Sequence, residues 1–565
     1  MKQSVLGIIP RQFRARGYLV TFTILLRALL NFVGLAALLP ILYLILDSDN
    51  IHSNRYLSAI YDTFGFSSDT SFVASVTAAM LLFIAVKCLV NLALYRFERD
   101  YIYALYRYLS RNLYIDYFNR GLSFIKSSNS AVLSRNVNVV CYTFVAGVLR
   151  PLASIFSEAM LFAMLFAAIL IYNPTAALLT VAIFVPSVWL YFALVRKRVN
   201  RYGDIENEAQ RTKYRNVVET YRGYADIEIN NAFPKMLSSF DRSIDTIIDV
   251  GAKNATVSTL PQIFTEIGLA AGMSLLVTMS VGSGSSDMKI LFGIFAVAAL
   301  RLLPSIRSIM AAWTALRYNR YTIDIIRDAD INKTSTVEDT ADDRFEFRDS
   351  IEIDNLSFRF ADSDKDTLHG LSFEIRKGEK IGIKGRSGAG KTTLFNLLLG
   401  FYRPTGGGIR IDGELLSESN RRKWQNTIGY VSQSVFLTDN TILANIALGC
   451  DEASIDIDRV NKAVDMANLR EFVDSLPNGL QSRIGECGAL LSGGQRQRIG
   501  IARALYKRAD ILFFDEATSS LDSDTERGIN ESIETLSRND DQLTIIIIAH
   551  RESSLDCCDR IIEIK

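Results

Sequence analysis

The sequence is poor in the side chains that most often hold zinc. It has six cysteines and three histidines, and no two cysteines are separated by two residues. Zinc sites usually show such cysteine pairs, or histidines at a fixed spacing from them, so we expect no zinc site. Cys557 and Cys558 are adjacent. They belong to the half of the chain that we expect to face the cytosol, where thiols stay reduced.

An excess of charge of one sign is also missing. Lysine and arginine together number 62 and aspartate and glutamate 61, which gives a formal net charge of +1. A chain with this balance creates no overall field that would draw it to the phosphates of nucleic acid. We therefore expect no nucleic-acid partner.

Residues 1–17 lead into an apolar run that lacks the small-residue cleavage site of a secretory signal peptide. They are basic, and the apolar run after them is much longer than the apolar core of a signal peptide. We interpret them as a basic segment that lies in the plane of the membrane and leads into a permanent first span.

Long apolar runs, in contrast, are abundant in the first ~300 residues, and their length is that of segments that cross a bilayer. The sequence predicts six membrane spans, at about residues 18–46, 71–95, 139–172, 176–194, 257–281 and 288–316. The stretch from Tyr95 to Val137 is rich in arginine, which places it in the cytoplasm. An even number of spans then leaves both chain termini on the cytoplasmic side.

The two predicted cytoplasmic stretches, which follow spans two and four, are too long to be simple turns. Disordered loops are the alternative, but the aromatic and apolar content of both stretches argues against disorder. We predict that spans two and three continue as helices below the membrane and turn near Gly121–Asn129, and that spans four and five do the same near Tyr221–Pro234. Residues 1–330 are therefore expected to form an all-α transmembrane domain with long cytoplasmic extensions.

The second half of the chain has a different pattern. Residues 331–344 are polar and acidic and are predicted to be a linker, and a domain is predicted from 345 to 565. Short strands alternate with helical segments there, which indicates an α/β domain. The predicted strands include Ile351–Ile353, Leu356–Phe358, Lys380–Lys384, Gly429–Val431, Ile511–Phe514 and Leu543–Ile548.

A glycine-rich loop lies between the strand that ends at Lys384 and a predicted helix that begins at Leu394. It fits the pattern G-x-x-x-x-G-K-[ST] and consists of Gly385, Arg386, Ser387, Gly388, Ala389, Gly390, Lys391, Thr392 and Thr393. Glycines let main-chain N–H groups turn toward phosphate oxygens, and the start of the helix adds its positive dipole end. Lys391 is then placed to reach the outer phosphates, and the Thr392 hydroxyl to hold Mg²⁺. A turn with no ligand is the alternative, but its flanks favour binding of a nucleoside triphosphate.

The apolar strand Ile511–Phe514 ends in two acids, Asp515 and Glu516. Taken alone, such a pair is an ordinary strand exit. In a domain with a phosphate loop, however, Asp515 is placed to hold Mg²⁺, directly or through water, and Glu516 can polarise the attacking water. We therefore predict a metal ligand at Asp515 and a catalytic carboxylate at Glu516.

A second glycine-rich turn, Leu491–Gln495, opens the predicted helix Arg496–Leu505. It provides another helix N-terminus able to bind an anion, although one domain needs only the Lys391 loop for its own nucleotide. Together the two loops resemble those of the ABC transporter family. The resemblance covers the whole chain, since six spans with long extensions and one ATP-binding domain are the layout of an ABC exporter half.

The resemblance implies contacts between two chains, because in that family the second turn closes over ATP held by the opposite subunit. The residues so implied to contact the partner's nucleotide are Ser492, Gly493, Gly494, Gln495 and Asp522. A homodimer is therefore expected, with a heterodimer as the alternative.

Further residues match the family one by one. Phe360 stands where an aromatic ring stacks on adenine, although tyrosine is more usual there, and Gln433 stands where a glutamine contacts Mg²⁺ and the transmembrane half. His550 matches the histidine that senses the γ-phosphate, and Gly485-Glu486 matches a segment that touches the transmembrane half, with Cys487 as an unusual neighbour. The resemblance thus implies ATP and Mg²⁺ as cofactors and makes His550 and Gln433 catalytic together with Glu516.

These features favour an ATP-driven exporter or flippase in a bacterial cytoplasmic membrane. A nucleotide-gated channel or regulator is the rival from another class, and loss of Glu516 or a broken second turn would favour it. A soluble ABC ATPase is excluded by the predicted spans. The segments Ala299–Ser305 and Asn54–Tyr61, the second a predicted short external helix, resemble the bacterial lipid-linked oligosaccharide flippases. Other lipids, peptides and drugs remain alternative substrates.

Two cations interrupt predicted spans, Lys87 in span two and Arg301 in span six. At 1.5 Å per residue they lie roughly 20–24 Å along their helices, at a similar depth. A cation in a span normally faces a partner or a wet cavity. Pairing with Glu266 or Glu158 is one interpretation. Attraction of an anionic headgroup, such as a lipid diphosphate, is the other.

Overall fold

A computed structural model describes residues 7–37, 55–66, 68–283, 286–329, 343–361, 363–516, 527–528, 531, 542–549 and 555–564. Within these ranges the side chains of residues 35–36, 55–58, 60, 172, 176, 179, 275–276, 279–283 and 286–301 lie outside the description. The chain divides into two compact units, Met1–Thr336 and Val337–Lys565. The division falls within residues 331–344, the predicted linker.

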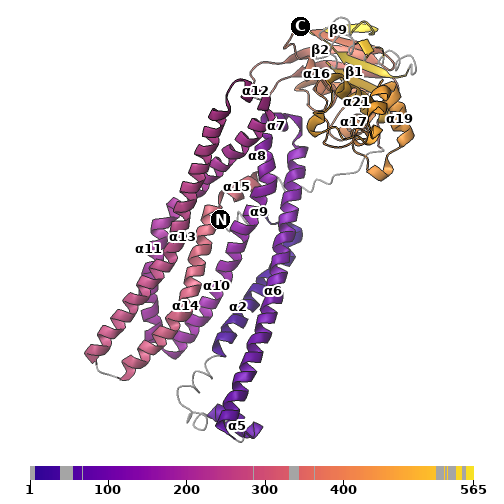
Figure 1. Ribbon diagram of the computed structural model, residues 1–565. Helices are drawn as coiled ribbons and strands as arrows, with labels where there is room; N and C mark the ends of the chain where they lie inside the picture. Colours follow the sequence, from indigo (N-terminus) through magenta and orange to yellow (C-terminus); the bar gives the residue numbers. More distant parts are fainter. Residues whose placement is uncertain are drawn as a thin grey trace. The chain divides into compact units, whose positions relative to one another are not determined.

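The described part of the first unit is helical (Figure 1). As predicted, the helices run far past the apolar stretches and the chain turns between Asn119 and Ser130 and between Arg222 and Phe233. The elements are α2 (Arg11–Ala36), α5 (Arg55–Phe64), α6 (Asp69–Asn119), α7 (Gly121–Ser127), α8 (Ser130–Arg135), η1 (Asn136–Val140), α9 (Cys141–Phe144), η2 (Val145–Leu149), α10 (Arg150–Tyr172), α11 (Pro174–Arg222), α12 (Tyr224–Ile229), α13 (Phe233–Ser283), α14 (Ser286–Tyr318) and α15 (Tyr321–Asp328).

Four helices in the described part of the chain are long and apolar enough to cross a membrane, namely Arg11–Gly34, Asp69–Asn119, Ser130–Ile171 and Thr180–Arg222. They overlap the first four predicted spans. The other two predicted spans fall on α13 and α14, where many side chains lie outside the description. One expectation is corrected: residues 11–17 do not form a separate segment before the span, because α2 begins at Arg11 and continues through it.

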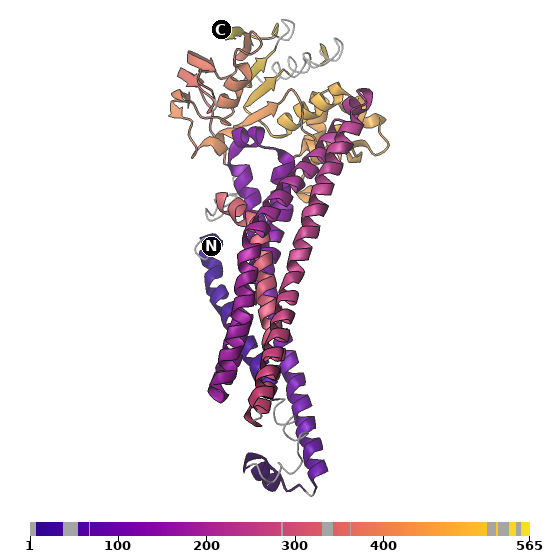
Figure 2. The same cartoon turned by 90° about the vertical axis from the view of Figure 1, so that its left-hand side faces the viewer.

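The long helices of the first unit pack side by side. Helix α11 lies along α13, α10 along α14, and α2 along α6 (Figures 1 and 2). The contact of α11, α13 and α14 buries an apolar cluster that includes Tyr191, Val257 and Met310. At Gly203 of α11 a Cβ atom would lie 1.9 Å from the main-chain oxygen of Tyr318. Glycine is therefore what allows the end of α14 to approach α11 so closely.

The described part of the second unit contains two sheets. One is antiparallel with strand order β2-β1-β4-β5, and the other is parallel with order β6-β7-β8-β3-β9. The strands are β1 (Ser350–Phe358), β2 (Leu368–Arg376), β3 (Lys380–Gly385), β4 (Gly406–Ile411), β5 (Glu414–Leu415), β6 (Ile428–Val431), β7 (Ile511–Asp515), β8 (Thr544–Ile548) and β9 (Arg560–Ile564). The helices are α16 (Lys391–Leu398), α17 (Arg421–Thr427), α18 (Ile442–Ile446), η3 (Glu452–Ser454), α19 (Ile457–Met466), α20 (Arg470–Ser475), η4 (Gly479–Gln481), η5 (Glu486–Gly488) and α21 (Gly493–Tyr506).

One predicted pair of strands is a single strand. The segments Ile351–Ile353 and Leu356–Phe358 both belong to β1, whose register with β2 shifts between Ile353 and Leu356. Asn355, at this irregularity, has a left-handed φ of 45°. The break in apolar alternation therefore marks a bulge within one strand rather than a turn between two.

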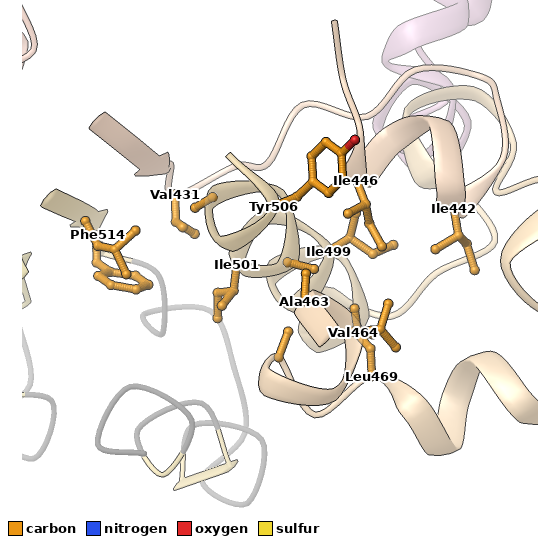
Figure 3. Packing of buried hydrophobic residues seen from close by; sticks show 14 of the residues in the cluster. Val431, Ile442, Ile446, Ala463, Val464, Leu469, Ile499, Ile501, Tyr506 and Phe514 are labelled. Atoms are coloured by element: carbon orange, nitrogen blue, oxygen red, sulfur yellow. The ribbon is translucent and has the colours of Figure 1, made fainter. Parts of the chain in front are cut away.

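An apolar core holds α21 against the parallel sheet. Figure 3 shows Ile499, Ile501 and Tyr506 of α21 in the same cluster as Val431 of β6 and Phe514 of β7. Ile499 and Ile501 are fully buried. The helix is thus fixed to the strands that lead to the predicted catalytic residues.

Candidate functional site

The parallel sheet brings the predicted nucleotide residues to one edge. Strands β7, β8 and β3 are parallel neighbours, so their carboxyl ends lie together, where ligands of open α/β sheets bind. Strand β3 leads into the Lys391 loop, and β7 ends at Asp515. Strand β6, next to β7, leads to Gln433. Residues far apart in sequence therefore meet at this edge.

The loop after β3 requires glycine at particular positions. A Cβ atom on Gly385 would lie 2.6 Å from the main-chain oxygen of Ile564 in β9. Gly388 and Gly390 have φ angles of 83° and 91°, in the region that glycine adopts without strain. Between these glycines Arg386 and Ser387 are exposed and Ala389 is half-buried.

Helix α16 begins directly after the loop, so its first N–H groups are free of helical partners and point toward it. The ammonium of Lys391 donates to the main-chain oxygens of Gly385 at 2.9 Å and Arg386 at 3.2 Å. Thr392 is exposed whereas Thr393 is buried, with 9% of its surface accessible. Of the two adjacent hydroxyls, Thr392 is therefore the one that can reach a metal ion.

Asp515 is buried, with 7% exposure, at the end of β7. The phenol of Tyr430, in β6, donates to its Oδ2 at 3.5 Å. Tyr430 is paired in register with Phe513, and Phe513 and Asp515 point to the same face of the strand. Burial, with the nearby Asp515 carboxylate, raises the pKa of Tyr430, so the phenol remains a donor. This contact was not predicted, because nothing in the sequence singles out a tyrosine in a buried strand.

Glu516 has an unusual backbone, with a left-handed φ of 47°. Its N–H donates to the main-chain oxygen of Ile548 at 2.9 Å, and its Oε2 accepts a hydrogen bond of 2.9 Å from Nε2 of Gln433. Non-glycine residues in this region cost free energy and are concentrated at functional sites. The structure thus brings together two of the predicted catalytic side chains.

Phe360, the predicted adenine contact, is 37% exposed. Its ring packs edge-on against Phe358 at 4.9 Å and Tyr402 at 5.8 Å between centroids. It lines an open pocket of about 690 Å³, next to the ion pair of Arg359 and Asp366 at 2.8 Å. An aromatic face is therefore available beside a hollow surface.

The second glycine-rich turn forms the start of α21. Ser492 is the N-cap: its hydroxyl accepts from the N–H of Gln495 at 3.2 Å, and the Gln495 side chain accepts from the N–H of Ser492 at 2.8 Å. This reciprocal capping leaves the N–H groups of Gly493 and Gly494 unused by the helix. Cys487, upstream, has a φ of 53°, which is unusual for a residue with a side chain.

Two predicted residues, Asp522 and His550, lie outside the described residues. The geometry of the other predicted nucleotide residues fits ATP and Mg²⁺. The loop at 385–391 has the glycine conformations and the helix start that phosphate binding needs. Thr392, Asp515 and Gln433 supply the oxygen ligands that Mg²⁺ prefers.

In the first unit, Lys87 belongs to what we call the polar seam, a line of polar contacts between α2 and α6. It consists of Arg27, Asn31 and Gly34 on α2 and of Lys87, Asn91 and Glu98 on α6. Arg27 pairs with the buried Glu98 at 2.8 Å, and Asn91 donates to Asn31 at 2.9 Å. Lys87 lies against Gly34.

Glu266, one of the two acids considered as a partner for Lys87, pairs with another residue. Glu266 lies 3.5 Å from Arg307 of α14, and Arg307 also donates to Thr265 at 2.7 Å. Among the described residues, no ion pair joins Lys87 to Glu266 or Glu158. The side chain of Arg301 lies outside the description. Arg307 was missed, although it also interrupts the apolar pattern of the last predicted span.

The model of a family described as ABC transporter matches residues 368–519, which run from β2 past Glu516 and include both glycine-rich loops. Several relatives are named ATP-dependent lipid A-core flippase. The one from Burkholderia pseudomallei strain 1710b is 32% identical over 391 residues, which is 68% of this chain and 64% of the relative. The chain therefore spans less than two thirds of that relative's length.

A longer match is found in Ralstonia nicotianae, whose lipid A-core flippase is 30% identical over 468 residues, 80% of this chain and 77% of its own. Among solved structures, a bacterial Atm1-family ABC exporter with ATP bound covers 100% of this chain and 93% of its own at a TM-score of 0.73. Its identity of 22% supports the fold alone. With helices and ATP-binding unit both matched and the loops in place, the chain belongs to the ABC transporter family.

Proposed function

We propose that the chain is half of an ATP-driven exporter. It would act as a flippase that moves an amphipathic molecule from the cytoplasmic to the outer side of the membrane by alternating access. The contact of Gln433 with the strained Glu516 carries this proposal, because it supports a catalytic carboxylate at the edge of the parallel sheet where β3 leads into the Lys391 loop. The other unit of the same chain supplies long apolar helices.

The proposed chemistry uses groups described above. Lys391 turns from the main-chain oxygens of its own loop toward the outer phosphates, and Glu516 polarises the attacking water while Gln433 holds its carboxylate. Mg²⁺, when bound, would be held by Thr392, Asp515 and the amide oxygen of Gln433, and it would offset charge on the phosphates. By resemblance, His550 senses the γ-phosphate.

The proposed working unit is a homodimer, with a heterodimer as the alternative. The start of α21 in one chain would complete the nucleotide site around Lys391 of the other, together with Asp522. The N–H groups that capping leaves free at Gly493 and Gly494 support this assignment.

Mixed dimers test this arrangement. Lys391→Ala and Ser492→Arg chains should each be inactive alone, and their mixture should recover up to one competent site in each mixed dimer. Full ATPase activity in either variant alone would contradict a site shared between two chains.

The proposed substrate is a lipid-linked oligosaccharide. In support, several relatives of this chain are named lipid A-core flippases, and the cargo in that name is a lipid. The segment Asn54–Tyr61 overlaps the short helix α5, and we propose that this helix lies on the outer side of the membrane. Lys87 and Arg301 are proposed to attract an anionic headgroup such as a lipid diphosphate. Other lipids, peptides and drugs are the competing cargoes.

Purified protein in liposomes separates these cargoes. ATP hydrolysis and translocation should both rise with a diphosphate-linked glycolipid, and should respond less to phospholipids, peptides or drugs. Ion flux gated by ATP without cargo movement would instead favour the channel alternative.

We also infer a multi-pass location in the bacterial cytoplasmic membrane, with both termini inside. Reporter fusions at residues 1 and 565 should be active in the cytoplasm. Activity of either reporter on the outer side would contradict this topology.

A further inference from the structure

Helix α21 carries a buried glutamine that contacts the Gln433 loop. Gln497 is 4% exposed, and its Nε2 donates to the main-chain oxygens of Gln433 at 2.7 Å and Ser432 at 3.4 Å. The side chain of Gln433 in turn donates to Glu516 at 2.9 Å. Gln497 therefore binds the main chain of Gln433, and the side chain of Gln433 binds Glu516.

A second polar contact fastens the same region to the same helix. Arg503 donates to the main-chain oxygens of Phe436 at 2.9 Å and Asn445 at 2.8 Å. Burial lowers the pKa of Arg503, but an arginine remains charged at neutral pH. With Ile499 and Ile501 packed in the core beside it (Figure 3), the helix and the loop form one closely packed body, which transmits displacement.

The other end of the Gln497 amide is unsatisfied. Its Oε1 is buried, and no described residue donates to it. A buried acceptor without a donor destabilises the folded protein, so packing alone would favour an apolar side chain of the same length. The two hydrogen bonds that Nε2 donates to the loop account for a glutamine at this position.

We propose that Gln497 is a positioning residue for ATP hydrolysis. It fixes the main chain of Gln433 relative to α21, and thereby controls the contact between Gln433 and Glu516. The inference rests on the proposed function, in which the start of α21 meets the nucleotide of the second chain. Movement of α21 onto that nucleotide would then shift Glu516 of the same chain, because the side-chain amides of Gln497 and Gln433 connect α21 to Glu516. Hydrolysis at one site thereby depends on occupancy of the other.

Two substitutions in the full-length protein, reconstituted in lipid vesicles, test the role. Gln497→Met removes both donors at nearly constant length, and Gln497→Glu places a carboxylate against two carbonyl oxygens. We expect kcat for ATP to fall at least about tenfold in the first variant and further in the second, with KM for ATP changed less than about threefold. Gln481→Met, at an exposed glutamine, is the matched control and should leave both constants unchanged. Wild-type kcat in both Gln497 variants would overturn the proposal.

A double-mutant cycle distinguishes positioning from a general defect. If Gln497 acts through Gln433, adding Gln497→Met to Gln433→Ala should lower kcat by less than about twofold, because the partner is already lost. The same tenfold loss in both backgrounds would overturn the proposal.

Amide hydrogen exchange supplies a readout independent of activity. Peptides that cover residues 432–438 should exchange faster in Gln497→Met than in wild type, while peptides from β2 should not change. If the wild-type protein hydrolyses ATP but Gln497→Met shows the same exchange as wild type, this inference is overturned and the proposed function is not. Absence of ATPase in the wild-type protein would overturn the proposed function and the catalytic part of this inference together.

Discussion

The side chain of Lys87 lies across Gly34 of the neighbouring helix, such that a Cβ atom built on Gly34 would be 2.7 Å from Lys87 Nζ. The obstructing atoms are the far end of a flexible chain, so Gly34→Ala should fold and displace the ammonium. If Lys87 attracts a lipid headgroup, the lipid concentration that half-stimulates ATPase should rise roughly tenfold, the equivalent of about 1.4 kcal/mol of binding. Lys87→Ala should abolish the stimulation and leave basal ATPase intact.

The matched control for this prediction is Gly251→Ala on α13, where an added Cβ meets no atom within 4 Å. It should leave lipid stimulation unchanged. If Lys87 instead serves folding, Lys87→Ala will reduce the yield of folded protein. Unchanged transport of a diphosphate-linked glycolipid by Lys87→Ala and Arg301→Ala would rule out the headgroup role.

Gly203→Ala should destabilise the first unit. The added Cβ would meet the main-chain oxygen of Tyr318 at 1.9 Å, and a main-chain atom cannot move aside as a side chain can. We expect a loss of roughly 1–3 kcal/mol, typical of overpacking, measured as a lower thermal unfolding midpoint in detergent. Gly251→Ala, the same chemical change in open space, should raise the midpoint slightly because alanine favours helix. Equal effects of the two variants would contradict the close approach.

Glu516→Gln should bind ATP but lose turnover, because an amide cannot accept the proton of the attacking water. We expect kcat to fall by about 10²–10⁴-fold, the usual contribution of a general base, and closed dimers to accumulate in ATP. Lys391→Ala should instead weaken nucleotide binding. Steady-state ATPase of Glu516→Gln at the wild-type rate would refute the catalytic role.

The pH dependence of the free energy of unfolding should reflect the protonation of Lys507. Burial is the larger and the charge of Arg344 the smaller of two causes that lower the pKa of the Lys507 ammonium to about 8. In the unfolded chain the pKa of a lysine is about 10.4. Between these values the unfolded chain binds a proton that the folded chain does not, so the free energy of unfolding should rise with pH. Below about pH 8 both states are protonated, and this rise should vanish.

The measurement compares wild type with Lys507→Met by chemical denaturation from pH 7 to 10. The difference between the two proteins should change only in the upper part of this range. Arg344→Gln should move the change to higher pH, because it removes the second cause of the shift. A difference that is constant across the range would contradict the assignment.

The glycine-rich loop after β3 could be predicted from the sequence because its geometry is local. Gly385, Gly388 and Gly390 are needed by the backbone of one loop. The flanking strand and helix can be recognised from a few apolar residues on either side. Asp515 and Glu516 could likewise be placed at a strand end from the apolar run before them.

Contacts that depend on which elements are neighbours could not be predicted in the same way. Glu266 was one of two acids considered as a partner for the cations in the spans, but Glu266 lies beside Arg307 and Lys87 lies against α2. Apolar periodicity shows which face of a helix is buried, but not which helix covers it. The amide of Gln497 was missed for the same reason, since its acceptors belong to a distant loop.

The polar seam between α2 and α6 has a consequence for how the chain enters a membrane. Either helix alone would present amide groups and a cation, Arg27 or Lys87, to hydrocarbon, and a charge at the centre of a span costs on the order of 2.5–3.5 kcal/mol on insertion scales. When the two helices pair, Arg27 forms an ion pair with Glu98 and Asn91 donates a hydrogen bond to Asn31. We therefore expect them to leave the translocation channel together as a hairpin, and a chain that stops before α6 to insert its first helix poorly.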